Sequence, residues 1–478
     1  MIKGYTSIRF LRVFLVLWIT YATYTMGRRP FSVARADIQR DTGLTAAQTS
    51  IVDTVFMLTY TVGQLGYGYI KKYLGNKEIL LYGILFSSVS SLLLAFSSSL
   101  LFFSLAWALN GFAQAAGWAT CLSILNYWIF PQERGRVMGW WSTNMAVGGV
   151  VGNVLPAFLI GKGFSWRLAV SIEAIVLMGV AVLIFFSLIQ HPNMVRLPSV
   201  QQVEENNITA GYLQEIGSLR LNKDGEICSP MCSSALTDSE PIQRMYNDSP
   251  SSKGISTSIN DYDSSLTFWQ IVFIPGVKGI CMSYFLHKLV RYGFMFWLPY
   301  FAVEELKYTT ESAGYVSSFF DIGGVIGTIA SGFCSDWLFH GKGRTRVILL
   351  FTLGMIIGTW CFGAFSHIFV ESVALCAVAV SVVGFFSFAI DALMSGSFLL
   401  DFLEHAKLTG QSGAISGVVG GMGSAGSIFQ GIFTVVLSSS SWSTLFYSFS
   451  LASAVASICL IQPLRYEMRG RHGTFSIV

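Results

Sequence analysis

The sequence predicts an all-α polytopic membrane protein with twelve transmembrane helices in two groups of six. Hydrophobic residues make up 53% of the 478 residues and charged residues only 12%, about half of the roughly 25% that is usual in soluble domains. The apolar residues fall into runs of about twenty, the length that a helix needs to cross the hydrocarbon core of a bilayer. The net charge of +4 is small and dispersed among the predicted loops, so binding to nucleic acid is not expected.

Six apolar segments precede a polar stretch and six follow it, each bounded by charged residues, Pro or Gly. They cover residues 9–34, 49–70, 78–97, 100–129, 136–161 and 166–190, and then 270–302, 311–338, 346–366, 369–400, 408–437 and 441–464. The first segment is too long for the core of a signal peptide, so we expect it to be retained as a span. The N-terminal half should therefore cover residues 1–190 and the C-terminal half residues 267–478.

The polar stretch between the halves, residues 191–266, differs in composition from the rest of the chain. It contains ten acidic and five basic residues and many Ser and Asn, so it cannot bury a core and is predicted to be a disordered loop. Cations concentrate in loops of the same parity, including Lys71, Lys72, Arg134 and Arg344. Because Lys and Arg favour the cytosolic side of a membrane, we expect this loop and both termini to be cytosolic.

An internal repeat relates the two groups of helices. Three features recur at offsets of 268 to 273 residues, each on the same ordinal span of its half: Gly111-Phe112 with Gly384-Phe385, Gly148-Gly149 with Gly420-Gly421, and Asp53 with Asp321. Two six-helix halves related by an axis along the membrane normal describe the major facilitator architecture, in which the substrate lies at the midplane between the halves. The glycines are expected to allow close approach of helices.

Cations inside the spans are candidate substrate ligands, because an Arg or Lys at the centre of a spanning helix costs about 2.5–3.5 kcal/mol. In the first span, Tyr21, Tyr24 and Arg28 should fall on one helix face, while Arg29 lies about 100° away. Pro30 removes a backbone donor, so a kink is expected beside these cations. The alternative for Arg28 is that its side chain extends to the membrane interface.

The seventh span contains His287, Lys288 and Arg291. Arg291 follows Arg28 by 263 residues, close to the repeat offset, so we expect the two guanidinium groups to meet at similar depth. They would repel each other unless an anion lay between them, and their planar forks match the oxygens of a phosphate group. Lys288 lies on an adjoining face or at the interface. His287 could titrate near neutral pH, or be an ordinary hydrogen-bonded helix residue.

Three of the carboxylates inside the predicted spans are further candidates. Asp53, Asp321 and Glu173 could carry protons or pair with arginines, and we favour a structural role for the two aspartates. Trp118 and Asn144 are candidate cavity-lining residues, although core packing would explain them equally well. The eight cysteines lack the spacing and the histidines of a four-ligand zinc site, so no metal is expected.

Several of these residues resemble the motifs of a known family. The combination of Tyr21-x-x-Tyr24-x-x-x-Arg28-Arg29-Pro30-Phe31 with Lys288-Leu-Val-Arg291-Tyr292-Gly293 resembles the organophosphate:phosphate antiporter family. Gly111-Phe112-x-Gln114-x-x-Gly117-Trp118 and Phe320-Asp321-Ile-Gly323-Gly324 are similar to the eukaryotic sugar-phosphate exchangers, which include the glucose-6-phosphate translocase of the endoplasmic reticulum. This resemblance implies that Arg28 and Arg291 hold a phosphoryl group, with Arg29 as a further family feature. Bacterial members carry a His where this chain has Met145.

We therefore predict a transmembrane antiporter that exchanges a phosphorylated small metabolite, such as a sugar phosphate, for inorganic phosphate by alternating access. One alternative is a proton-coupled symporter of another anion that uses Asp53, Asp321 or Glu173, and another is a non-transporting nutrient sensor. An enzyme is not expected, because no Ser/His/Asp or paired-carboxylate arrangement is legible.

The expected partners are the phosphorylated substrate, inorganic phosphate and the lipid bilayer, and no cofactor is expected. An endoplasmic-reticulum or other endomembrane location is favoured over the plasma membrane. The sequence does not indicate an oligomeric state.

Overall fold

The computed structural model describes residues 8–129, 134–195, 197, 268–274, 276–339, 344–395, 398 and 412–470. All regular structure within these residues is helical. The helices are α1 (Ile8–Met26), α2 (Pro30–Val33), α3 (Arg35–Thr42), α4 (Ala46–Ile70), α5 (Asn76–Phe96), α6 (Leu100–Ala115), α7 (Gly117–Asn126), α8 (Arg134–Gly161), α9 (Trp166–Ser187), η2 (Pro192–Val195), α12 (Phe268–Val272), α13 (Val277–Glu304), α14 (Thr310–Phe339), α15 (Arg344–Ala364), α16 (Ser366–Phe369), α17 (Val373–Met394), α19 (Ser412–Ser438), α20 (Trp442–Cys459) and α21 (Ile461–Gly470).

These helices form twelve long segments within the described residues. The first six are α1 with α2, α4, α5, α6 with α7, α8 and α9, and the second six are α13, α14, α15, α17, α19 and α20. Ten are long and apolar enough to cross a membrane. The other two, α4 and α13, carry charged and polar residues of the candidate site, which lower their hydropathy. The predicted all-α, two-times-six fold is confirmed.

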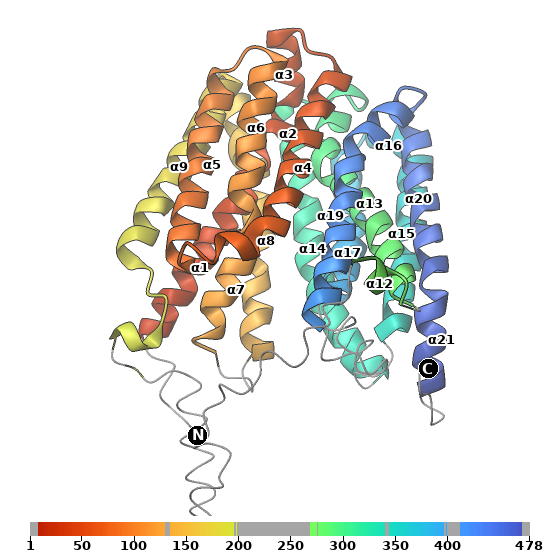
Figure 1. Cartoon of the computed structure of the whole chain (residues 1–478). Helices are drawn as coiled ribbons and strands as arrows, with labels where there is room; N and C mark the ends of the chain where they lie inside the picture. Colours follow the sequence, from red (N-terminus) through yellow and green to blue (C-terminus); the bar gives the residue numbers. More distant parts are fainter. Residues whose placement is uncertain are drawn as a thin grey trace, which may run out of the picture.

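Both ends of the helical assembly lie at one face, where α1 begins and α21 ends (Figure 1). We call this the terminal face, and we call the opposite side, where α3 lies, the α3 face. The predicted disordered loop lies almost entirely outside the described residues, because only residues 191–195 and 197 of residues 191–266 are described.

The first span is broken where the sequence predicts a kink. α1 ends at Met26 and α2 begins at Pro30, which occupies the first turn of α2, the position where a missing N–H does no harm. Between them, the amides of Arg28 and Arg29 donate to the carbonyls three residues earlier, on Thr25 and Met26, at 3.4 Å and 3.0 Å. These hydrogen bonds to the third preceding residue wind the backbone more tightly than an α-helix does, at the point where Arg28 and Arg29 turn to different partners.

The sequence repeat corresponds to a repeat in helix packing. A Cβ atom added at Gly111 would lie 2.3 Å from the carbonyl oxygen of Phe56, and one at Gly384 would lie 2.0 Å from that of Phe320. Glycine is therefore required for α6 to pack closely on α4 and, equivalently, for α17 to pack closely on α14.

The second pair of repeated glycines is less symmetric. Gly148 of α8 approaches the Ala22 carbonyl so closely that a Cβ would lie 2.1 Å from it, which confirms the packing role predicted for that glycine. In the other half, Gly426 of α19 makes the equivalent approach, at 2.0 Å to the Phe285 carbonyl, whereas Gly420 has nothing within 4 Å. The prediction of close packing at Gly420 is thus wrong, because Gly420 lies on an exposed face of α19, whereas the neighbouring Val419 is buried.

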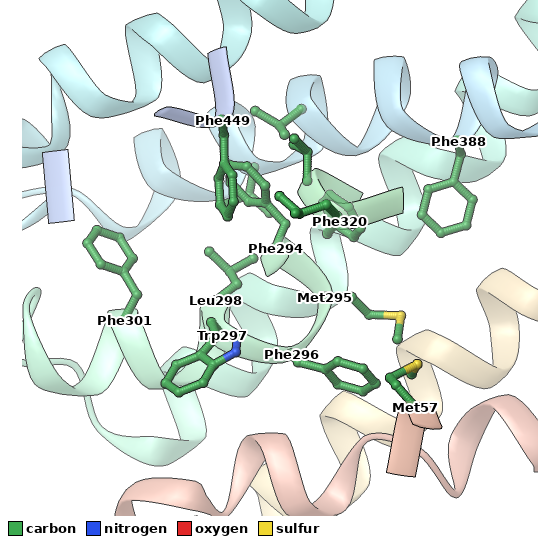
Figure 2. Packing of buried hydrophobic residues seen from close by; sticks show 14 of the residues in the cluster. Met57, Phe294, Met295, Phe296, Trp297, Leu298, Phe301, Phe320, Phe388 and Phe449 are labelled. Carbon is green, nitrogen blue, oxygen red and sulfur yellow. The ribbon is translucent and has the colours of Figure 1, made fainter. Parts of the chain in front are cut away.

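Helix α13 connects the core of its own half to the other half. Phe294 packs on Phe320 and Phe449, with ring centroids 6.0 Å and 5.5 Å apart. On the opposite side of the same helix, the Phe296 ring meets Phe56 of α4 edge-on at 6.4 Å. Figure 2 shows Met295 of α13 beside Met57 of α4. α13, which carries His287, Lys288 and Arg291, is therefore packed on both sides.

The two halves are joined on the α3 side of the molecule. The Thr310 hydroxyl donates to Asp37 at 2.9 Å, and the Ser32 hydroxyl donates to the carbonyl of Phe296. Towards the terminal face, Gln64 of α4 still accepts a hydrogen bond from Ser424 of α19 at 2.9 Å. Beyond that point, Leu65 is 72% exposed. A Cβ atom added at Gly421 of α19 would still lie 4.0 Å from the Leu65 side chain, so α4 and α19 remain close at this point.

Candidate functional site

Arg28 lies buried at the break in the first span and has neutral partners. Its Nε donates to Gln114 Oε1 of α6 at 2.6 Å. Its Nη2 lies 3.4 Å from the Tyr60 hydroxyl of α4, and its guanidinium lies over the Tyr60 ring at 4.8 Å. None of these partners is anionic. The guanidinium is therefore positioned by hydrogen bonds, while no carboxylate among the described residues compensates its charge.

Gln114 is itself oriented by other buried groups. Its Nε2 donates to Asn110 Oδ1 at 2.8 Å and to the Ser87 hydroxyl at 3.1 Å. Because both amide hydrogens are used in this way, Oε1 is turned towards Arg28. The network of Ser87, Asn110 and Gln114 thus fixes the Arg28 side chain from within the N-terminal half.

The two cations of α13 share one carboxylate. Lys288 Nζ lies 2.7 Å from Asp391 Oδ1, and Arg291 forms an ion pair with Asp391 Oδ2. The Tyr284 hydroxyl donates to Oδ1 at 3.0 Å, and the Arg291 guanidinium lies over the Phe388 ring at 4.0 Å. Asp391, from α17, is therefore the anionic partner of both α13 cations.

Tyrosines lie between the cations of the two halves. Tyr292 of α13 is within electrostatic range of Arg28, Lys288 and Arg291. Tyr21 of α1 is within electrostatic range of Arg28 and Tyr292. Arg28 and the α13 cations therefore face one region between the halves, which is the arrangement expected from their repeat spacing.

Arg29 has different partners from Arg28, and they lie in the other half of the molecule. Its Nη2 lies 2.6 Å from Asp321 Oδ1 of α14, in the other half, and both side chains are at most 2% exposed. Its Nη1 donates to the Met295 carbonyl at 3.3 Å, and Asn153 Nδ2 donates to the second Asp321 oxygen at 3.2 Å. Arg29 and Asp321 thus form a buried ion pair that joins the two halves.

Asp53 is likewise paired, with an arginine that follows the end of the first predicted span. Arg35 of α3 is fully buried and forms an ion pair with Asp53 of α4. Its guanidinium also lies over the Trp297 ring of α13 at 3.9 Å, a cation–π contact between the halves. Asp53 and Asp321 thus each have an arginine partner, as expected for structural carboxylates.

The remaining predicted residues are spread more widely. The Tyr24 hydroxyl donates to the Leu80 carbonyl at 3.2 Å, so this side chain packs within the N-terminal half. Trp118 stacks edge-on with Tyr21 at 4.9 Å, beside the region of the cations. Asn144 of α8 is fully buried, and neither side-chain atom has a hydrogen-bond partner among the described residues, which makes it a candidate ligand for a polar substrate group.

Two titratable residues differ in their relation to the cations. His287 is buried within electrostatic range of Lys288, Arg291 and Asp391, and its Nε2 has no partner in the described part of the chain. Glu173 of α9 is fully buried, and both its oxygens lack hydrogen-bond partners in that same part. No charged neighbour acts on Glu173, so it stands apart from the cation cluster.

Three residues of this site were not predicted as such. Asp391 lies inside the apolar segment 369–400, and the rule that flagged the other membrane carboxylates would have found it. Gln114 appeared only within a family motif. Arg35 gave no usable signal, because it directly follows the apolar segment 9–34, where a loop is expected.

Comparison with known proteins agrees with this architecture. The family model of the Major Facilitator Superfamily matches residues 17–429. The glucose-6-phosphate exchanger SLC37A2 of Xenopus tropicalis is 23% identical over 96% of this chain and 93% of its own length. The human glucose-6-phosphate exchanger SLC37A1 is 24% identical, covering 95% and 93%, and sugar phosphate exchanger 3 of Xenopus laevis is 26% identical, covering 88% and 79%. The resemblance to sugar-phosphate exchangers is thus confirmed.

A solved structure shows the same fold. The D-xylose-proton symporter superimposes with a TM-score of 0.64 at 12% identity, covering 98% of this chain and 99% of that one. The family consists of membrane transporters, which confirms the prediction that the chain is not an enzyme. With two groups of six helices and a family model matching most of its length, the chain is an integral, multi-pass membrane protein that belongs to the Major Facilitator Superfamily.

Proposed function

We propose that this protein is an antiporter that exchanges a phosphorylated small metabolite, a sugar phosphate, for inorganic phosphate. The observation that carries the proposal is Arg28, a buried guanidinium whose partners in the described part of the chain are all neutral, and which faces two further cations from the other half. A buried charge without a counter-ion is costly, and an anion that bridges Arg28 and Arg291 would remove that cost. The similarity to the sugar-phosphate exchangers named above supports a phosphate ester as that anion.

The arrangement of the halves supports alternating access about this site. The Arg29–Asp321 pair, the stacking of Arg35 on Trp297 and the Thr310–Asp37 hydrogen bond hold the α3 side together. Because these contacts between the halves gather on the α3 side, we assign the structure to a state open to the opposite, terminal face. With both termini in the cytosol, this state faces inward, and outward opening requires the Arg29–Asp321 pair to break.

The cellular setting is part of the same proposal. The loop cations Lys71 and Lys72 lie on the terminal-face side, which supports cytosolic termini. The endoplasmic reticulum or another endomembrane is the expected location, because phosphorylated metabolites are made in the cytosol and an exchanger of this class would move them into a lumen. The lipid bilayer surrounds the spans, and inorganic phosphate is the counter-substrate.

A proton-coupled symporter of another anion is the second candidate function, and Glu173 is the residue that favours it. Asp53 and Asp321 are both engaged by arginines, which makes them poor proton carriers. Glu173 is a buried carboxyl without a partner in the described chain, although it lies apart from the cations. If protons drive transport, Glu173→Gln should abolish pH-driven uptake, whereas an exchanger should still exchange phosphate for phosphate.

Reconstitution of the purified protein in phosphate-loaded liposomes tests the proposal. Labelled glucose 6-phosphate and labelled inorganic phosphate should enter against internal phosphate, and unphosphorylated glucose should not. Protein-free liposomes and the Arg28→Gln variant provide the baseline. Equal entry of glucose and glucose 6-phosphate would overturn the assignment of a phosphate-linked substrate.

A further inference from the structure

Among the described residues near the candidate substrate site, Asp391 is the carboxylate with the most polar partners, namely Lys288, Arg291 and Tyr284. One oxygen meets both Lys288 Nζ and the Tyr284 hydroxyl, and the other pairs with Arg291. The Asp391 side chain is 13% exposed and that of Lys288 is 15% exposed. The carboxylate therefore lies at the edge of the region that an anion would enter, on the same two cations that the anion would use.

The charges around this region do not cancel. Arg29 with Asp321 and Arg35 with Asp53 form separate one-to-one pairs. That leaves Arg28, Lys288 and Arg291 facing the region, with Asp391 as their carboxylate among the described residues. With histidine taken as neutral, three positive charges and one negative charge leave a net charge of two positive units.

We propose that Asp391 sets the charge preference of the site, so that a dianionic phosphoryl group leaves the occupied site neutral. This inference rests on the proposed function and names a specificity-determining residue for it. Asp391 would repel anions of higher charge at close range. A monoanion would leave one positive charge uncompensated in the desolvated site. Inorganic phosphate and a phosphate monoester are both dianions at mildly alkaline pH, so either one satisfies the same site.

The absolute affinity for anions does not test this idea. Asp391 competes with any anion for Lys288 and Arg291, so removing its charge should strengthen the binding of all anions. The informative quantity is the ratio between the inhibition constants of two anions of different charge. At a separation of several ångströms and an effective dielectric near 20, one extra charge on the ligand should change that ratio by about tenfold or more.

The experiment measures inhibition of labelled-phosphate exchange by pyrophosphate and by sulfate at mildly alkaline pH, in proteoliposomes. The Asp391→Asn variant should favour pyrophosphate over phosphate by about tenfold more than the wild type does. Lys288→Gln should shift the ratio in the opposite direction, and Lys288→Gln/Asp391→Asn should return it to the wild-type value. The sulfate-to-phosphate ratio should stay constant in all variants, because both anions are dianions.

Two control variants separate charge from other effects. Asp41→Asn removes a carboxylate paired with Arg167 on the exposed α3 side and should leave the pyrophosphate-to-phosphate ratio unchanged. Tyr284→Phe removes a hydrogen bond to Asp391 without changing the charge, and it too should leave the ratio unchanged. If a variant inserts but does not exchange, the same ratio is measured as the shift in its melting temperature with each anion.

The outcomes of the two proposals are distinguishable. A pyrophosphate-to-phosphate ratio that is the same in the wild type, Asp391→Asn and Lys288→Gln would overturn the role of Asp391 while phosphate exchange persists. A ratio that fails to return in the double variant would also overturn it. Absence of phosphate-dependent exchange in the wild type would instead overturn the proposed function.

Discussion

Removing Arg29 alone should destabilise the protein far more than removing Arg29 together with Asp321. The two side chains are 2% and 0% exposed, and their charged atoms lie 2.6 Å apart. In Arg29→Met, Asp321 would keep one hydrogen bond, from Asn153 at 3.2 Å, and would lose its counter-ion. Breaking a buried pair in this way costs about 3–5 kcal/mol, whereas replacing both members is often close to neutral.

The variants for this test are Arg29→Met, Asp321→Asn and the double substitution. In Asp321→Asn, the amide can still interact with Asn153, but Arg29 is left as an unpaired buried cation beside the Met295 carbonyl. Stability is measured as the free energy of unfolding in detergent, from the fluorescence of the 12 tryptophans. The coupling energy of the double-mutant cycle should be about 2 kcal/mol or more.

The same cycle at an exposed pair provides the control. Arg167 and Asp41 lie 2.9 Å apart with side chains 35% and 48% exposed, so their coupling energy should stay below about 1 kcal/mol. If the double variant Arg29→Met/Asp321→Asn lost as much stability as the two single variants combined, the buried pair would not be coupled. The reasoning from burial would then fail.

Three further predictions follow from the same contacts. Arg28→Lys and Arg291→Lys keep the charge but lose the planar fork, so each should slow phosphate exchange by about tenfold or more, because a hydrogen bond to a charged group is worth about 1.5–3 kcal/mol. Lys288→Arg should slow exchange less. Normal transport by both lysine variants would contradict a bidentate clamp. Gly148→Ala should destabilise the protein by about 1–3 kcal/mol through overpacking against Ala22, whereas Gly332→Ala, where nothing lies within 4 Å, should be neutral or stabilising in the same melting assay. Protease added outside sealed, right-side-out vesicles should leave residues 191–266 intact, and cleavage there would reverse the assigned orientation.

The spans were predictable because their signal is local. Long apolar runs, the glycines that recur at a fixed offset and the Pro30 break all follow from chemistry within a segment or from its repetition. Gly420 is an exception, since whether a glycine touches another helix depends on which face of its helix meets a neighbour in this conformation. Sequence periodicity does not record that conformational variable.

The pairing of charges was less predictable because it is tertiary. Arg28 and Arg291 were expected at similar depth, and the structure brings their side chains to one region. The partner of Arg291, however, is Asp391, a hundred residues further along the chain on α17. Sequence spacing within one helix cannot identify such a partner. For the same reason it could not predict that Arg35 is buried against Asp53 and Trp297. The repeat offset predicted that Arg28 and Arg291 would face the same region, whereas the fold determines which carboxylates neutralise the cations.

The central claim is that transport is a phosphate-linked exchange, and it rests on the uncompensated charge at the site. When the site is empty, two net positive charges must be enclosed as the halves close, which is unfavourable in a desolvated region. A bound dianion removes that charge and supplies the differential interaction that a conformational change requires.

The most direct measurement is the initial rate of labelled-phosphate uptake into proteoliposomes with and without internal phosphate, under conditions where reorientation of the carrier limits the rate. We predict faster uptake into the phosphate-loaded liposomes, because loaded carriers return more quickly than empty ones. Equal initial rates would contradict exchange and would favour the proton-coupled alternative.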